Sequence, residues 1–197
     1  MNKNQVVWLI VILTIASFLR LYDLKNVPPG LWADEAVNGV NALRALGPPA
    51  GGWKVFYPEN FGREGLFINI QSLFVWALGT EPWVLRLPSA IIGILTVLGL
   101  YLMTLDLFQH NNNQSTNPKP EKIPKLQYPT LGFANWIFFR NSGLGFGNLS
   151  NKRIALFSAF FMATSFWHIN FSRIGFRAIM APFFLVWAFY FLFKAMS

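Results

Sequence analysis

The sequence of 197 residues contains no cysteine and only eight acidic residues. Without cysteine there is no disulfide framework, no thiolate nucleophile and no cysteine-ligated metal site. Charged residues of both signs make up only 12% of the chain. Because acids are so scarce, their positions are informative, and one pair of carboxylates is adjacent in the sequence: Asp34 and Glu35.

Hydrophobic residues make up 54% of the chain, with 21 Phe and 8 Trp, and the mean hydropathy is +0.40. A soluble domain could not cover so much apolar surface, so the composition indicates an integral membrane protein, and we expect it in a plasma membrane of the bacterial type. The net charge of +8 does not indicate nucleic acid as a partner. Lysine and arginine flank the apolar runs, which favours a topological role for these charges.

Four segments have the length and polarity of membrane spans: about 6–22, 87–108, 153–172 and 178–194. A fifth apolar segment, 65–79, is too short for a comfortable crossing and carries Asn69 and Gln71. We interpret it as an interfacial or re-entrant helix. The sequence therefore predicts a single all-α membrane domain over residues 1–197.

The distribution of charge predicts the orientation of the spans. Residues 23–86 form one long loop with five basic and six acidic residues, whereas 109–152 and the next residue, Arg153, contain six basic residues and one acid. By the positive-inside rule, the N-terminus and the basic loop lie inside and 23–86 lies outside. Asparagine, proline and lysine in the basic loop, without apolar periodicity, predict a flexible segment.

Within the outer loop, the turn at 28–30 precedes a predicted amphipathic helix that ends before Gly47, with Asp34 at its N-cap. Asp34 and Glu35 allow two interpretations. One carboxylate could take a proton from an acceptor group while its neighbour orients the site or binds a cation. Alternatively, Asp34 caps the helix and Glu35 complements the helix dipole, and on spacing alone this interpretation is favoured.

Further charged residues are candidates for phosphate binding or catalysis. Arg63 could bind a phosphate at the headgroup level and Glu64 could serve as a second acid, or both could lie in a solvated turn. Arg173 and Arg177 are four residues apart, which predicts a shared helical face at the outer end of the third span. They either bind phosphate oxygens or extend to the headgroups as anchors. Arg86, at the start of the second span, is predicted to be an interface anchor.

Four short motifs follow one another along the chain: PPGLWADE at 28–35, REGLF at 63–67, RLPSA at 86–90 and SRIGFRA at 172–178. Together they resemble the N-terminal part of GT-C superfamily membrane glycosyltransferases, in the branch of the protein mannosyltransferases and lipid A aminoarabinose transferases. The resemblance covers nearly the whole chain outside 109–150. Where some relatives carry a further acid after the third span, residues 178–182 contain none.

The resemblance implies an inverting transfer, at the outer membrane face, of a sugar from a polyprenyl-phosphate donor to a lipid, glycan or protein acceptor. It implies Asp34 as the general base with Glu35 beside it, and Glu64 as a substitute second acid. Basic residues would hold the lipid phosphate: Arg63, Arg173 and Arg177. If a divalent cation takes part, Asp34 and Glu35 are its expected ligands. The alternative is a truncated or degenerate, non-catalytic membrane assembly partner.

Overall fold

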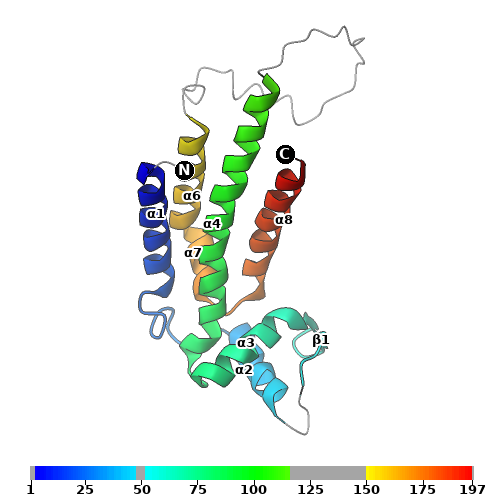
Figure 1. Cartoon of the computed structure of the whole chain (residues 1–197). Helices are drawn as coiled ribbons and strands as arrows, with labels where there is room; N and C mark the ends of the chain where they lie inside the picture. The colour runs from blue at the N-terminus through cyan, green and yellow to red at the C-terminus, as the bar shows by residue number, and fades with distance from the viewer. Residues whose placement is uncertain (1–2, 48–51, 116–149, 197) are drawn as a thin grey trace.

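A computed structural model describes residues 3–47, 52–115 and 150–196, and it is mostly helical (Figure 1). Its elements in chain order are α1 (Lys3–Leu21), α2 (Ala33–Leu46), β1 (Phe56–Tyr57), β2 (Arg63–Glu64), α3 (Gly65–Leu78), α4 (Pro82–Ser115), α6 (Asn151–Thr164), α7 (Phe166–Arg173), the 3-10 helix η2 (Arg177–Ile179) and α8 (Met180–Met196). The two strands form a short antiparallel hairpin, which departs from the all-α prediction.

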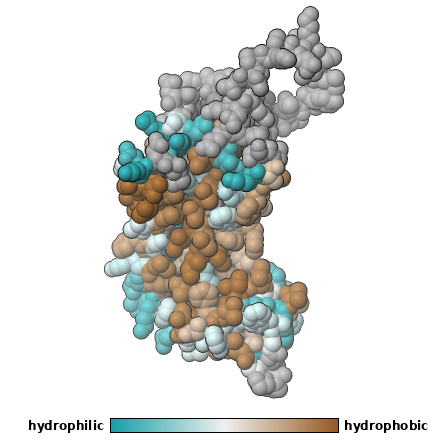
Figure 2. All heavy atoms as spheres, in the orientation of Figure 1, coloured by the Kyte–Doolittle hydropathy of each residue, from teal (hydrophilic) through white to brown (hydrophobic). Residues whose placement is uncertain are grey.

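Among the described residues, three helical segments are long and apolar enough to cross a membrane, Lys3–Leu21, Pro82–Phe108 and Arg177–Ala195, and the bent α6–α7 pair makes a fourth if it counts as one span. In Figure 1, α1, α4, the α6–α7 pair and α8 run side by side, while α2, α3 and the hairpin lie together at one end of this bundle. Hydrophobic residues cover much of the side of the bundle in Figure 2. This arrangement agrees with a membrane protein whose loop 23–86 folds against one end of its spans.

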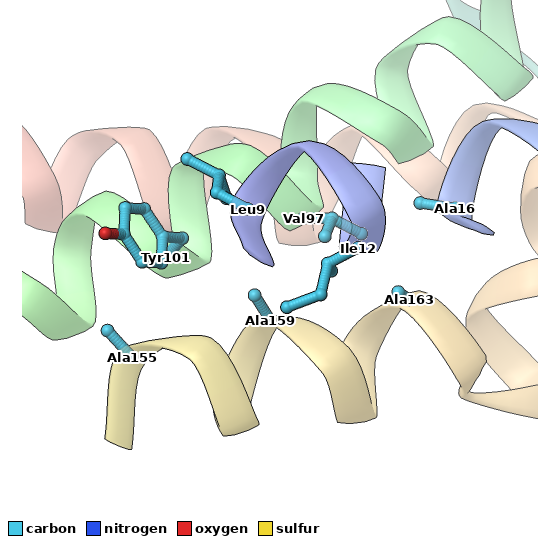
Figure 3. Packing of buried hydrophobic residues seen from close by; sticks show 8 residues of the cluster. All are labelled: Leu9, Ile12, Ala16, Val97, Tyr101, Ala155, Ala159 and Ala163. Carbon is cyan, nitrogen blue, oxygen red and sulfur yellow. The ribbon is translucent and has the colours of Figure 1, made fainter. Parts of the chain in front are cut away.

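The core of the bundle depends on small residues. Ala155, Ala159 and Ala163 repeat every fourth residue of α6, and all three are fully buried against α1 and α4. Figure 3 shows them facing Ile12 of α1 and Val97 of α4. Because alanine has only a methyl side chain, the helix backbones can approach closely, and close packing is what holds helices together in lipid.

The third predicted span is not one straight helix. α6 ends at Thr164 and α7 begins at Phe166, with a bend of 55° between them. Arg20, which is fully buried at the end of α1, donates to the carbonyl oxygens of Ala163 at 2.9 Å and Met162 at 3.2 Å. Carbonyls at a helix end lack intrahelical partners, so Arg20 satisfies the groups that the bend exposes.

Two other predicted boundaries are wrong. The second span starts at Pro82 rather than at 87, and its helix continues to Ser115, so residues 109–115 are helical rather than part of a flexible loop. Residues 116–149, the remainder of that predicted loop before α6, lie outside the described residues. The segment predicted as interfacial or re-entrant forms α3, a helix of 14 residues that is shorter than a bilayer crossing requires.

Helix α2 is amphipathic in an unexpected sense. Its buried face carries three polar residues, Glu35, Asn38 and Asn41, each no more than 3% exposed, beside the small residues Ala42 and Ala45. The apolar residues Val40 and Leu43 point away from the protein, and each is 47% exposed. A helix that buries polar groups in the protein and exposes apolar ones is suited to lying on a membrane surface.

Candidate active site

Glu35 forms a buried ion pair with Arg86. The Arg86 Nε donates to Glu35 Oε1 at 3.0 Å, and both side chains are only 1% exposed. Glu35 Oε1 also accepts the backbone N–H of Gly175 at 2.7 Å, and Oε2 accepts that of Trp32 at 2.9 Å. Since both carboxylate oxygens accept hydrogen bonds and neither reaches solvent, Glu35 is a structural residue.

Arg86 is not the interface anchor that its position predicted. It donates to three backbone carbonyls of the segment between α1 and α2, those of Leu24, Pro28 and Gly30, as well as to Glu35. All of these groups lie in the protein interior or at its edge, so Arg86 fixes the path of the loop that leads into α2.

Asp34 is not the N-cap of α2. The N-cap is Trp32, and Asp34 and Glu35 occupy the second and third helical positions. The acid that satisfies the N-cap backbone is Glu35, through its bond to the Trp32 N–H. The predicted capping role of Asp34 is therefore wrong, and Glu35 makes the bond to the N-cap backbone instead.

Asp34 is half-buried and accepts a hydrogen bond of 2.6 Å from the Nδ2 of Asn60. Asn60 lies in the turn between β1 and β2, where three consecutive residues have positive φ: Asn60, Phe61 and Gly62. Phe61 at φ +66° is a strained conformation for a side chain of its size, and strained backbone clusters at functional sites. The turn thus holds an amide against one oxygen of Asp34.

Arg63 lies behind this turn and is only 1% exposed. It donates to the Oδ1 of Asn38 and to the carbonyl of Glu59, but its Nη2 has no hydrogen-bond partner among the residues that the structure describes. Burial lowers the pKa of Arg63 from its ordinary value, and the charge of Arg177 acts in the same direction. The negative charges of three carboxylates act in the opposite direction on this pKa: Asp34, Glu59 and Glu64.

Glu64 and Arg177 form an ion pair at 3.1 Å between β2 and η2, with side chains 64% and 35% exposed. A pair so exposed contributes little to stability, so each partner can exchange the other for a different ion at little cost. The structure thus brings four predicted site residues together at one end of the bundle: Asp34, Arg63, Glu64 and Arg177.

Arg173 lies apart from this cluster. Its guanidinium donates to the backbone carbonyls of Leu19 and Val27, both at 2.9 Å. The predicted shared face with Arg177 is wrong, because α7 ends at Arg173 and the next residues are extended, with Ile174 at ψ 146° and Phe176 at ψ 128°. Arg173 attaches the end of α7 to the end of α1 and the loop after it.

An apolar cavity of about 210 Å³ lies between α3, α4 and α8. Eight apolar side chains from α3, α4 and α8 line it: Ile70, Phe74, Pro88, Ile91, Ile92, Met180, Phe183 and Phe184. Met180 directly follows η2, the element that carries Arg177. One lining residue of the cavity is therefore three positions from Arg177 in the chain.

The described residues do not fit a divalent cation held between Asp34 and Glu35. A hard cation requires several oxygen ligands, and both oxygens of Glu35 already accept N–H donors, including those of Arg86. Within the described ranges, no group of three or more His, Asp or Glu side chains is arranged to hold a metal ion.

The sequence motifs meet in space although they are far apart in the chain. Glu35 of the first motif contacts Arg86 of the third and Gly175 of the fourth, and Glu64 of the second pairs with Arg177 of the fourth. Sequence reasoning missed Asn38 and Asn60, although polar residues at every third position from Glu35 could have indicated a buried polar face on α2.

Comparisons of this chain with protein-family models, with curated proteins and with solved structures found no match.

Proposed function

We propose that this protein is a membrane glycosyltransferase module that transfers a sugar from a polyprenyl-phosphate donor to an acceptor at the outer membrane face. The observation that carries the proposal is that four separate motifs meet at one end of the bundle, where Glu35 contacts Arg86 and Gly175 and Glu64 pairs with Arg177. In this proposal α1, α4, the bent α6–α7 pair and α8 are four spans, and α2 and α3 lie at the membrane surface.

Asp34 is the proposed general base. Its half-buried carboxylate has one bond from Asn60 and oxygen lone pairs to spare, whereas the Glu35 carboxylate is enclosed and fully engaged. Asp34 takes the proton of the acceptor hydroxyl or amine as the acceptor atom forms a bond to the anomeric carbon. The bond from that carbon to the phosphate oxygen breaks with inversion, and its electron pair leaves with the lipid phosphate.

The departing phosphate gains negative charge, which a cation must stabilise. Arg177 is the accessible candidate, since it is 35% exposed and, within the described ranges, forms an ion pair with the exposed Glu64 alone. Arg63 lies deeper and retains an Nη2 without an acceptor. In this proposal a phosphate displaces Glu64 from Arg177. The positive charge of Arg63, deeper in the protein, also stabilises the phosphate.

The apolar cavity between α3, α4 and α8 suits the beginning of the lipid chain. All eight of its lining side chains are apolar, and one of them, Met180, directly follows η2 in the chain. A donor whose phosphate lies at Arg177 would extend its first isoprenoid groups into this space, where apolar burial contributes to binding.

Two substitutions at the ion pair test this arrangement by transfer of labelled sugar from a polyprenyl-phosphate donor to acceptors in membranes. Arg177→Gln is expected to weaken donor use at least tenfold, since a charge-assisted phosphate contact is worth roughly 1.5–3 kcal/mol. Glu64→Gln frees Arg177 and is expected to lower the KM for the donor. A large fall in kcat in Glu64→Gln would instead assign Glu64 as the second acid.

An exposed arginine outside the cluster supplies the control. Arg44 is 56% exposed and pairs with Glu59 at 3.4 Å, so Arg44→Gln removes a comparable charge without touching the proposed phosphate site. Equal donor use by Arg177→Gln and Arg44→Gln would contradict the proposed role of Arg177. Absence of transfer by the wild-type chain, with acceptor membranes supplied, would favour the non-catalytic alternative.

A further inference from the structure

A second groove lies far from the charged cluster, between α1 and α6 near the N-terminal ends of both helices. Its volume is about 720 Å³, within the usual range of ligand sites. Figure 1 places these helix ends at the opposite end of the bundle from α2 and α3. The groove therefore belongs to the other membrane face and takes no part in the proposed transfer.

One end of this groove is polar and positively charged. Lys152 and Arg153 from α6 lie there, together with Asn4 and Gln5 from α1. Lys152 is half-buried and Arg153 is exposed, and no ion pair among the described residues includes either of them. Two adjacent cations at the mouth of a groove favour an anionic ligand.

The rest of the groove is apolar. Trp8, Val11 and Ile15 line it from α1, and Phe157 and Phe160 line it from α6. The rise of 1.5 Å per residue gives roughly 16 Å between residues 4 and 15. This is close to half of a hydrocarbon core of about 30 Å, the depth of one leaflet.

We propose that this groove binds one anionic glycerophospholipid of the adjacent leaflet. Its phosphate would lie at Lys152 and Arg153, and an acyl chain would follow the apolar wall toward the middle of the bilayer. The order of the groove, cationic at the membrane surface and apolar over one leaflet, matches the order of headgroup and chain in such a lipid. The alternative occupant is a helix of a second copy of the chain, and such a helix would not need Lys152 and Arg153 at the mouth of the groove.

Native mass spectrometry of the purified full-length chain, with equal amounts of phosphatidylglycerol and phosphatidylcholine, tests the site. We expect a single bound lipid with a preference for phosphatidylglycerol of roughly thirtyfold, from two basic residues near a headgroup. The double variant Lys152→Gln, Arg153→Gln is expected to lose this preference. Val11→Trp, which fills the groove, is expected to lose the bound lipid.

Two control variants match these changes elsewhere. Lys194→Gln removes a basic residue from α8, which lies across α4 from the groove, and Val55→Trp adds bulk at a side chain that is 92% exposed. Both should retain the wild-type preference. Equal binding of the two lipids by the wild-type chain, or a preference that survives in the double variant, overturns the proposal. A dimer that Val11→Trp abolishes, in place of a lipid adduct, also overturns it.

Discussion

The substitution Glu35→Gln removes the negative charge from the buried pair with Arg86 and leaves the shape of the side chain nearly unchanged. Both partners are 1% exposed, and the carboxylate accepts from Arg86 Nε at 3.0 Å, Gly175 N at 2.7 Å and Trp32 N at 2.9 Å. Breaking a buried pair by removing one partner costs about 3–5 kcal/mol, because the remaining charge is left uncompensated. We expect Glu35→Gln to lower the free energy of unfolding by that amount.

The matched control is the neighbouring acid. Asp34→Asn removes a half-buried carboxylate near a helix N-terminus, where the dipole contribution is about 0.3–1 kcal/mol. Circular dichroism of the two variants during denaturation in detergent would compare their stabilities. Arg86→Met should cost at least as much as Glu35→Gln, because it leaves the Glu35 charge uncompensated and also removes the donors to the carbonyl oxygens of Leu24, Pro28 and Gly30.

The reasoning is refuted if Glu35→Gln and Asp34→Asn have the same stability. It is also refuted if Arg86→Met is more stable than Glu35→Gln, because the loop carbonyls would then not depend on Arg86.

Three further predictions concern the frame of the protein. Gly175→Ala would place a Cβ 2.9 Å from the carbonyl oxygen of Leu85 and should destabilise the protein by about 1–3 kcal/mol in the same denaturation assay, whereas Gly47→Ala, with nothing within 4 Å, should not. Arg20→Met removes the donors to the carbonyls at the end of α6 and should destabilise the protein by about 3 kcal/mol, with faster hydrogen exchange in α7. Since the chain has no cysteine, Trp53→Cys provides a single labelling site, which an impermeant maleimide should reach from outside intact cells. Labelling only after permeabilisation would reverse the predicted orientation.

The apolar segments could be predicted from the sequence because hydropathy over about 20 residues depends on local composition alone. The bend in the third span could not. It depends on Arg20, which is more than 140 residues away in the chain from the carbonyls that it contacts. No local pattern around Ser165 contains that information.

The site was predictable in part. Four charged residues selected from the sequence do lie together, but the adjacent acids Asp34 and Glu35 have opposite environments. Successive residues of a helix point about 100° apart, so one carboxylate of an adjacent pair can face the protein interior while the other faces outward. Spacing along the chain does not show which acid faces inward, because that depends on Arg86 and Gly175 from other elements.

The same limit explains Arg173 and Arg177. Their spacing of four residues predicts one face only if the helix continues, and the extended residues after Arg173 end it. One arginine then contacts backbone carbonyls of α1 and the following loop, while the other pairs with Glu64.

The proposed role of Asp34 is tested most directly by sugar transfer from a labelled polyprenyl-phosphate donor, comparing membranes that contain the wild-type chain with membranes that contain Asp34→Asn. Loss of a general base is expected to lower kcat by about 10²–10⁴, while the amount of folded protein and the binding of donor stay close to wild type. Equal transfer by Asp34→Asn and the wild-type chain would contradict the assignment of Asp34 as the base.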